Sequence, residues 1–381
     1  MKFLLIYVPN LRFREFNEQL IYTSFEKVIK LYRGSSPRPI INYVTTDENG
    51  VNWIKIGDMP SVGNKVFSCS EKITKDGSKK SRAVYKGDII LSNSMSFGKP
   101  YILGIDGFIH DGWFVIRDYK KYLDKTYLCQ LLSSDIVQNQ YKSTAAGGVV
   151  KNISSDLVNS VKFHLPSIIE QRKIARFLES IDQRIETQIK IIDDYNSLKM
   201  GIYNCMFKEN YADYKLKQLA YIVKGDQINN DQLLSNGSYY MMNGGTSPSG
   251  YIDSYNVSEN TISISEGGNS CGYVQFNSCP FWSGGHCYTI QNVNSALIEN
   301  KYLYHYLKYK EKEIMNLRIG TGLPNIQKKD LENFTILVPS LLIQRKNLAL
   351  FEMLDEKISI LNEELANLQK QKKYLLCNMF I

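Results

Sequence analysis

The chain has 381 residues, 43% of them hydrophobic, so it is long enough for two or three domains with real cores, and wholesale disorder is excluded. The opening residues carry no signal-peptide pattern and no stretch reaches about 18 uninterrupted apolar residues, so we expect a cytoplasmic protein without a membrane span. The formal net charge of +8 suits a polyanionic partner without requiring one.

The seven cysteines are scattered and are never spaced as C-x-x-C, which indicates reduced thiols rather than a disulfide framework. Cys271, Cys279, His286 and Cys287 form the one cluster, but their gaps match no common zinc spacing. Buried or half-buried thiols are therefore favoured over a metal, and we expect no metal site.

Residues 1–165 predict a first unit of mixed α/β structure. Strands are expected in GVNWIKIGDM, GDIILSNS and WFVIRD, and a helix in YLDKTYLCQLLSSDIVQNQYKS. Three loops, at residues 33–39, 79–82 and 93–100, combine basic, amide and hydroxyl side chains with turn-forming residues. Arg and Lys suit phosphates and guanine edges and Asn suits adenine edges, although any one such loop is also typical of a plain solvated turn.

A long segment follows at 166–208, and its sequence returns at 339–381. Pro166 aligns with Pro339, an offset of 173 residues (339 minus 166), and 11 of the next 42 positions are identical without a gap. Unrelated sequences would share about two or three. The chain is therefore an internal duplication with a long period.

Apolar residues in both copies keep a heptad spacing, which predicts two long helices of roughly 60 Å with narrow seams. We expect the two helices to pair with each other; the alternative, in which each packs on its own unit, requires a wider apolar stripe. Lys199 and Lys372 occupy the same seam position, either to fix the register or as lysines at frayed ends. The expected interface residues are Leu178, Ile181, Ile185, Ile192, Leu354, Ile358, Leu361 and Leu365.

Residues 209–338 predict a second unit with the same order of elements and different surface residues. Strands are expected in NTISISEGG, CGYVQF and CYTIQNV, and a helix in ALIENKYLYHYLKYKEKEIMNL. Polar, glycine-containing loops lie at 223–230, 243–251 and 266–270, and glycine lets a backbone approach a ligand closely.

Catalytic motifs are absent from the sequence. It contains no P-loop, no G-x-G-x-x-G after a strand, no H-E-x-x-H and no G-x-S-x-G. His110 beside Asp111 could form an acid-base pair, but neighbours in a strand point to opposite faces, so a structural histidine is favoured. The pattern indicates a binding protein rather than an enzyme.

The whole layout resembles the specificity subunit of type I restriction-modification systems. The resemblance covers nearly the full chain and is carried by VPNLRFREF, by LPSIIEQRKIARFLESID and VPSLLIQRK at the two helix entries, and by the polar loops between them. The second entry is less typical, because Ile343 and Asn347 stand where the first has Glu170 and Ile174.

This resemblance implies an α+β fold with a pseudo-twofold internal duplication: two target recognition domains, at 1–165 and 209–338, separated by an antiparallel coiled coil of the helices at 166–208 and 339–381. Each domain is expected to read one half of a bipartite sequence in double-stranded DNA, while the helices set the spacer and dock two methyltransferase subunits. Motor-nuclease restriction subunits would join that core. The partner subunits, and not this chain, are expected to use S-adenosylmethionine, ATP and Mg.

The loops supply candidate DNA-binding residues of two kinds. Phosphate contacts are expected from Arg33, Arg38, Lys79, Lys80, Arg82, Lys99, Lys224 and Arg318. Base contacts are expected from Ser36, Asn93, Ser94, Asn243, Thr246 and Asn269.

Two other classes remain open. A coiled-coil scaffold or adaptor that binds proteins through its two globular domains accounts for the seams but not for the paired basic and glycine-containing loops. A relative of single-chain restriction enzymes would need catalytic motifs that the sequence lacks. The DNA bases read and the spacer length do not follow from the sequence.

Overall fold

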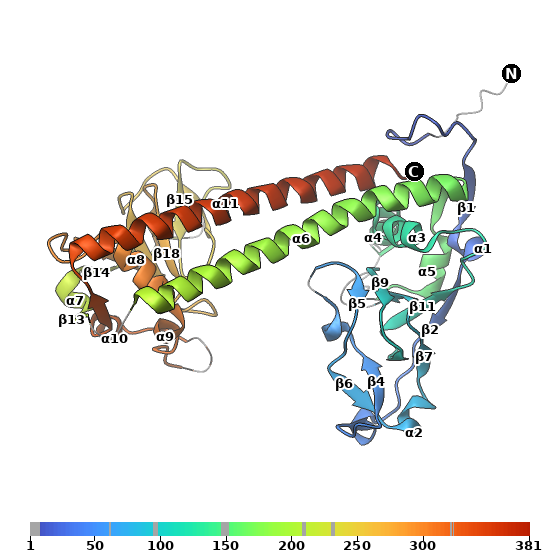
Figure 1. Ribbon diagram of the computed structural model, residues 1–381, viewed down its shortest axis with the longest axis horizontal. Helices are drawn as coiled ribbons and strands as arrows, with labels where there is room; N and C mark the ends of the chain where they lie inside the picture. The colour runs from blue at the N-terminus through green and yellow to red at the C-terminus, as the bar shows by residue number, and fades with distance from the viewer. Residues whose placement is uncertain are drawn as a thin grey trace. The chain divides into compact units, whose positions relative to one another are not determined.

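The computed structural model describes residues 8–60, 62–93, 98–145, 152–207, 211–229, 233–320, 322 and 324–381. The chain divides into two compact units, each with its own sheets (Figure 1). Unit 1 comprises Met1–Lys190 and Asn362–Ile381, and unit 2 comprises Ile191–Leu361. The boundaries expected at residues 165, 208 and 338 stay sequence-based predictions, because both long helices are shared between the units.

Two five-stranded sheets and a two-stranded ribbon form the β structure of unit 1. The first sheet has the order β2-β11-β8-β9-β5, the second β3-β6-β4-β10-β7, and the ribbon pairs β1 with β12. The strands of the first sheet are β2 (Lys30–Arg33), β5 (Lys65–Val66), β8 (Ile89–Ser92), β9 (Pro100–Leu103) and β11 (Trp113–Arg117). The others are β1 (Ile21–Ser24), β3 (Val44–Thr45), β4 (Val51–Ile54), β6 (Glu71–Ile73), β7 (Arg82–Val84), β10 (Gly107–Ile109) and β12 (Lys162–Leu165).

The helices of unit 1 cover the first sheet and enclose the larger of its two cores. That core holds Phe114 and Ile116 of β11, Leu128 of the first covering helix, Leu178 of the first long helix and Phe380 near the chain end. Burying such side chains stabilises the unit by roughly 1.5–3 kcal/mol each. The short helices are α1 (Phe25–Val28), η1 (Ile40–Asn42), η2 (Ile56–Asp58), α2 (Lys75–Ser78), α3 (Lys125–Ser133), α4 (Asp135–Ala145) and α5 (Ser155–Ser160).

Unit 2 has a four-stranded sheet in the order β14-β20-β17-β18, a three-stranded sheet β16-β15-β19, and a ribbon of β13 with β21. Its core is built from the four-stranded sheet, from Tyr302 and Leu307, from Tyr203 and Phe351 of the long helices, and from Phe207, directly after α6. The strands are β13 (Ala212–Lys215), β14 (Tyr221–Lys224), β15 (Tyr239–Met242), β16 (Gly250–Ile252), β17 (Thr261–Ser265), β18 (Val274–Asn277), β19 (Trp282–Ser283), β20 (Cys287–Gln291) and β21 (Thr335–Val338). The short helices are α7 (Leu216–Leu219), α8 (Asn300–Tyr309), α9 (Glu311–Met315) and α10 (Lys328–Glu332).

The two units repeat one backbone frame. In unit 1 Trp113 of β11 pairs with Ser92 of β8, and in unit 2 Cys287 of β20 pairs with Ser265 of β17. The residues after β8 and β17, Asn93 and Glu266, each accept a backbone hydrogen bond, from Ile153 at 2.7 Å and from Ile326 at 2.9 Å. These donors are 173 residues apart, so the duplication extends into the globular parts.

A buried glutamine explains why the sequence at the helix entries is repeated. Gln171 accepts a hydrogen bond from the backbone N–H of Asp124 at 2.9 Å and donates to the carbonyls of Tyr122 and Pro166, each at 3.0 Å. Gln344 makes the same three bonds, with Glu299 at 2.8 Å, Leu297 at 2.9 Å and Pro339 at 2.8 Å. Each glutamine therefore joins the start of a long helix to the start of α3 or α8.

The atypical second entry also has a structural reason. Glu170 is only 1% exposed, and Arg12 from the N-terminal segment donates to both of its carboxylate oxygens at 2.8 Å. A buried carboxylate needs such a partner. Ile343 stands at the matching position and is 38% exposed, so no buried charge has to be matched there.

The long helices α6 (Ile168–Met206) and α11 (Leu341–Asn378) run antiparallel within each unit (Figure 1). In unit 1 Asp182 pairs with Lys372 and Gln188 donates to Glu364 at 3.0 Å, so later residues on α6 meet earlier residues on α11. In unit 2 Lys199 pairs with Asp355. The two ion pairs are the same pair displaced by 173 residues, which places both seam lysines in cross-helix contacts rather than at frayed ends.

The seam residues expected from the heptad pattern lie on the inner faces of these helices. Six are buried and two, Ile358 and Leu365, are half-buried. The buried six are Leu178, Ile181, Ile185, Ile192, Leu354 and Leu361. Within the described ranges, none of the helices is both long and apolar enough to cross a membrane.

Candidate nucleic-acid interface

In unit 1 the candidate residues gather around Asp111, which lies between β10 and β11. Its carboxylate accepts hydrogen bonds from the Ser36 hydroxyl at 2.7 Å and from the Arg38 guanidinium at 3.0 Å. Its backbone carbonyl accepts from Arg33 Nε at 3.2 Å and from the Asn93 amide at 2.9 Å. The Ser36 hydrogen bond is the main reason why the pKa of Asp111 is lowered, so the group stays ionised.

The loop at 79–82 lies against this cluster. Ser35 donates to the carbonyl of Lys80 at 3.0 Å, and Arg82 Nε donates to the carbonyl of Arg33 at 3.1 Å. Lys80 lies 4.7 Å above the ring of Tyr43, while Lys79 is exposed and pairs with Asp76 at 2.8 Å. The structure thus brings Arg33, Arg38, Lys80 and Arg82 to one surface of unit 1.

The three candidates from the loop at 93–100 differ in their surroundings. Asn93 is 3% exposed and its amide is bonded to the Asp111 carbonyl, so it holds the loop together instead of facing solvent. It was expected to contact a base because amides suit adenine, but its place directly after the buried strand β8 turns it inward. Ser94 lies outside the described residues. Lys99 is half-buried and lies 5.1 Å from the ring of Tyr101.

His110 has the structural role that the sequence favoured. Its Nδ1 accepts a hydrogen bond from the backbone N–H of Gly112 at 2.9 Å, and its ring lies between Trp53 and Trp113. Burial is the main reason why the pKa of His110 is lowered, which favours the neutral ring.

In unit 2 the polar loops gather around a different carboxylate, Glu266, which takes the frame position of Asn93. Its Oε1 accepts from Lys224 at 2.6 Å and from the Tyr288 hydroxyl at 3.1 Å. Its Oε2 is buried without a hydrogen-bond partner among the described residues and lies 3.7 Å from Nδ1 of His286. Asn243 Oδ1 accepts from the backbone N–H of His286 at 2.9 Å, so Lys224, Asn243 and His286 meet around one carboxylate.

The remaining candidates of unit 2 are exposed. They are Thr246, Asn269 and Arg318. Cys271 is buried and donates to the Glu266 carbonyl at 2.9 Å, Cys287 is buried and Cys279 is exposed. In the part of the chain that the structure describes, no three His, Cys, Asp or Glu side chains are arranged to hold a metal ion.

The two surfaces use the same positions of the shared frame with different side chains. Arg33 and Lys224 end the matching strands β2 and β14, and each precedes a glycine. A Cβ on Gly34 would meet the His110 carbonyl oxygen at 2.0 Å, and one on Gly225 would meet the Gly284 carbonyl oxygen at 2.3 Å. Only glycine permits this close approach, which anchors the basic residue before it.

Sequence reasoning missed the two carboxylates that organise these surfaces. Asp111 and Glu266 each hold a basic side chain in place. A basic side chain oriented in this way can leave the carboxylate and bind a phosphate instead. Carboxylates also accept from the exocyclic amino group of cytosine. A weak signal was present in the sequence, since each of the two acids is followed by a glycine. Their contacts, however, join segments 75 and 42 residues apart.

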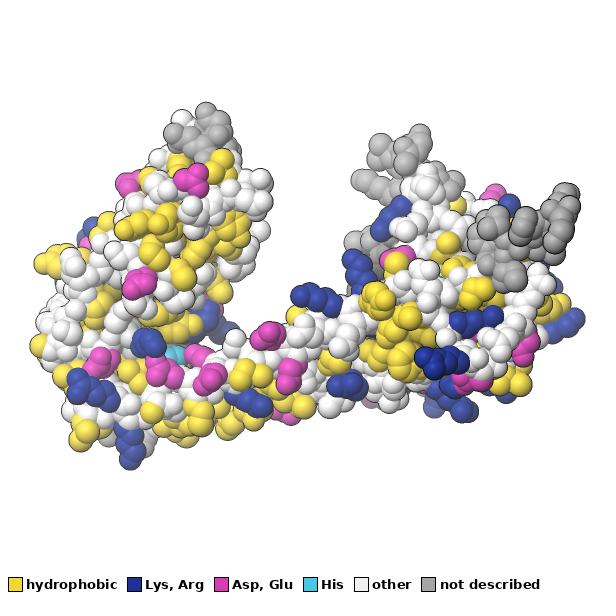
Figure 2. Space-filling view, turned by 90° about the horizontal axis from the view of Figure 1, so that it is seen from above, with side chains coloured by type: hydrophobic (Ala, Val, Ile, Leu, Met, Phe, Trp, Pro, Cys, Tyr) yellow, Lys and Arg dark blue, Asp and Glu magenta, His cyan; other side chains and the backbone are white. Residues whose placement is uncertain are grey.

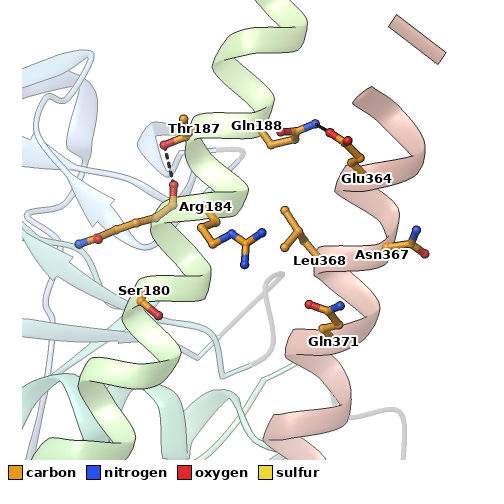
Figure 3. A pocket seen from close by; sticks show the side chains of 9 residues that line it. Ser180, Arg184, Thr187, Gln188, Glu364, Asn367, Leu368 and Gln371 are labelled. Carbon is orange, nitrogen blue, oxygen red and sulfur yellow. Dashed lines mark hydrogen bonds between the residues drawn. The ribbon is translucent and has the colours of Figure 1, made fainter. Parts of the chain in front are cut away.

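A hollow between the long helices of unit 1 interrupts the apolar seam. It has a volume of about 590 Å³ and is lined mainly by polar side chains. Figure 3 shows Arg184 and Gln188 of α6 on one side and Glu364, Leu368 and Gln371 of α11 on the other. Gln188 takes the position at which the second copy has Leu361, which explains the break in the heptad pattern.

Comparisons with known proteins agree with this arrangement. The family model described as type I restriction modification DNA specificity domain matches the chain twice, at residues 29–193 and 208–370. A protein of Mycoplasma pneumoniae described as a type I specificity subunit is 34% identical over 155 residues, covering 40% of this chain and 41% of that protein. The chain therefore matches well under two thirds of that relative's length.

A longer match and a solved structure extend the comparison. A protein of Methanocaldococcus jannaschii described as the specificity subunit of a type I restriction enzyme is 25% identical over 328 residues, 76% of each chain. The crystal structure of a type I restriction-modification S subunit from M. genitalium has a TM-score of 0.64 at 18% identity, covering 98% of this chain and 99% of that one. This last likeness concerns the fold alone.

Proposed function

The chain belongs to the family of type I restriction-modification DNA specificity subunits, and on that basis we propose that it is the sequence-specific DNA-binding subunit of such a complex. Each globular part reads one half of a bipartite target in double-stranded DNA. The two long helices set the spacer between the halves and dock two methyltransferase subunits, and motor-nuclease subunits complete the complex.

The observation that carries this proposal is one frame built twice with different side chains. Asp111 with Arg38 and Ser36 organises the surface of unit 1, and Glu266, at the frame position of Asn93, organises the surface of unit 2 with Lys224 and His286. A protein that reads two unlike half-sites needs one way of approaching DNA and two sets of base contacts. The duplication with divergent loops meets both needs.

Phosphate and base contacts divide among the candidate residues by the chemistry of their side chains. The exposed basic residues Arg33, Arg38, Lys80, Arg82, Lys224 and Arg318 suit phosphates, which supply affinity and little sequence information. Ser36, Asn243, Thr246 and Asn269 suit base edges. Asn93 supports the loop that carries Asp111 and is not proposed as a base contact.

The long helices suit the role of a spacer. α6 has 39 residues and α11 has 38, so each spans roughly 55–60 Å at about 1.5 Å per residue. Half-sites on one face of a duplex recur about every 34–36 Å. Helices of this length are long enough to span a proposed separation of about one turn or slightly more, with an unread spacer between the half-sites.

The proposal gives this chain no chemical step. The methyltransferase subunits would use S-adenosylmethionine, and the motor-nuclease subunits would use ATP and Mg. Extruding a base for methylation costs a few kcal/mol, and the partner that binds the base would supply it.

The experiment is to delete the gene for this chain and to map methylated adenines in the genome before and after deletion. We expect one split motif to be methylated in the parent and unmethylated in the deletion strain, and to return on complementation. A protein-binding scaffold would leave every methylated motif unchanged, and that result would overturn the proposal.

A further inference from the structure

A basic hollow lies in unit 1 at the end of β11 remote from Asp111. It has a volume of about 940 Å³. The basic side chains that line it are Lys86, Arg117, Lys120, Lys121, Lys125 and Arg172. Three carboxylates also line it, so the lining carries a formal charge of +3 (six minus three).

The three carboxylates are already engaged in other contacts. Asp88 accepts from Arg117 at 3.0 Å, and Asp118 pairs with Lys30 at 3.5 Å. Asp124 caps α3 by accepting from the backbone N–H groups of Thr126 and Tyr127. Among the described residues, no carboxylate lies within ion-pair distance of the other five cations: Lys86, Lys120, Lys121, Lys125 and Arg172.

Unit 2 has the same backbone at this place without the charge. Gly87 and Asp118 have positive φ angles, and so do the matching Asn260 and Asn292. The shared register places Gln291 where unit 1 has Arg117. The matching strands β8 and β17 place Glu259 at the position of Lys86, and the glutamine bonds to Asp124 and Glu299 place Asn300 at the position of Lys125.

The other cations of the hollow are also missing or neutralised in unit 2. Residues 293–298, which match the segment holding Lys120 and Lys121, contain no Lys or Arg. Arg345, the counterpart of Arg172, is paired with Glu299 at 2.8 Å. The fold therefore does not require the positive charge, and neither does any task that both units perform alike.

The hollow continues the basic surface around Asp111. Arg82 of β7 donates to the Arg33 carbonyl at 3.1 Å, and Arg117 donates to the carbonyl of Ala83, the next residue of β7, at 3.1 Å. Beyond β7 the chain reaches Lys86 at the hollow. Lys and Arg side chains gather over unit 1 in the space-filling view (Figure 2).

We propose that this hollow binds the phosphate backbone of DNA that flanks the half-site read by unit 1. The proposal rests on the proposed function, because unit 1 must already hold a duplex at the Asp111 surface. Four residue steps, along β7 and the residue after it, lead from Arg82 to Lys86, a distance of about 13 Å. One strand carries a phosphate about every 3.4 Å of rise, so the hollow lies roughly four base pairs outside the contacts at Arg82.

A protein segment rich in acidic residues is the competing occupant. Continuity with the Asp111 surface favours DNA, since the duplex leaving that surface must continue past β7. Four of the six cations are lysines, which bind phosphates as point charges without requiring a fixed bidentate geometry. Among the described residues, the matching place in unit 2 lacks these unpaired cations, so the flanking contact occurs at one end of the target.

The test compares two triple variants in the complete methyltransferase complex. The first is Lys120→Gln, Lys121→Gln, Lys125→Gln in the hollow. The matched control is Lys217→Gln, Lys329→Gln, Lys346→Gln, which removes the same charge from exposed lysines of unit 2. Binding is measured from 50 to 200 mM salt on duplexes that carry the methylated motif, with about ten flanking base pairs at both ends or trimmed to two at one end or the other.

We expect the hollow variant to lower the slope of log affinity against log salt by about 0.9 per lost phosphate contact, up to about 2.7, on the long duplex. On the duplex trimmed at the end that would reach the hollow, the hollow variant should bind like the wild type. On the duplex trimmed at the opposite end, the difference in salt slope between the variant and the wild type should remain. The control should keep the wild-type slope on every duplex.

Two results would overturn the proposal. One is an unchanged slope on the long duplex, and the other is a loss that does not depend on flank length. Loss of co-purifying methyltransferase with an unchanged DNA slope would identify a protein segment as the occupant instead. A wild-type complex that does not prefer the motif over a scrambled duplex would reject the proposed function itself, which separates the two failures.

Discussion

Single residues show that each reading surface is organised by one carboxylate. Asp111 fixes Ser36 and Arg38, and Glu266 fixes Lys224. The basic residues could be predicted from the sequence, since Arg and Lys in polar loops are the usual phosphate ligands. The carboxylates could not, because their role depends on which distant loops the fold brings together.

Replacing Asp111 by Asn removes the charge and keeps the size of the side chain. The Asn amide cannot hold Arg38 as the carboxylate does, so the loop at 33–39 loses its position, at a cost of up to about 1 kcal/mol for an exposed ion pair. We expect a loss of selectivity for one half-site only, measured by competition with duplexes substituted in each half. Glu266→Gln is the matched variant and should affect the other half, and equal losses at both halves would contradict the assignment.

His305 provides a prediction on pH. It is 2% exposed and its Nδ1 lies 2.7 Å from the Tyr203 hydroxyl. Burial, with smaller effects from Lys199 and Lys301, lowers the pKa of His305 to about 3, although Asp355 lies 3.9 Å away. The unfolded chain, with a pKa of about 6.5, therefore takes up the proton first, so the stability due to neutral His305 is full above about pH 6.5 and falls toward pH 3.

We expect the free energy of unfolding of the wild type to fall by up to about 1.4 kcal/mol per pH unit in that window because of His305. His305→Gln should remove this part of the slope, since unit 1 carries Gln130 at the matching place, bonded to Asp182 at 2.8 Å. Urea unfolding at several pH values measures both. Identical slopes for the two proteins would show that His305 does not titrate on unfolding.

At the scale of elements, the duplicated helices were the part most fully predictable from sequence. Heptad spacing identified the buried face of α6 and α11, and the two ion pairs explain Lys199 and Lys372. The β architecture was less accessible. From the sequence we predicted only a few strands in each unit. The structure has more, and many of them are only two to four residues long. Such segments carry too few residues for a period of two to be recognised.

The glutamine at each helix entry should be required for stability. Gln171→Leu leaves the backbone N–H of Asp124 and two carbonyls without their partner, and unsatisfied buried groups cost about 1–3 kcal/mol each. We expect a loss of roughly 2–4 kcal/mol in urea unfolding, and a similar loss for Gln344→Leu. Gln369→Leu, at an exposed position of α11, is the control and should change the unfolding free energy by less than about 0.5 kcal/mol.

The cross-helix ion pairs should respond to charge exchange. Lys199→Glu places a second carboxylate beside Asp355, and we expect it to destabilise the helix pair by about 1–2 kcal/mol. Adding Asp355→Lys restores opposite charges and should recover most of that loss. A double-mutant cycle in thermal unfolding measures the coupling, and a coupling energy near zero would mean that the pair is screened by solvent.

At the scale of the whole molecule, the duplication gives one chain two globular parts that, on the proposed function, act as separate readers. The frame is shared, the side chains of the two candidate surfaces differ, and the unpaired cations of the basic hollow have no unpaired counterparts among the described residues of unit 2. Each half of the target should therefore be changeable without the other. The spacer should follow the helices, because their seam and ion pairs are independent of the loops that carry the reading residues.

The most direct test is to determine the methylated motif in a strain whose chain carries Ser36→Ala and Asp111→Asn in unit 1. The account predicts a motif relaxed in one half, with the other half and the spacer length unchanged. A motif that is unaltered, or one that relaxes equally in both halves, would contradict the division of reading between the two units.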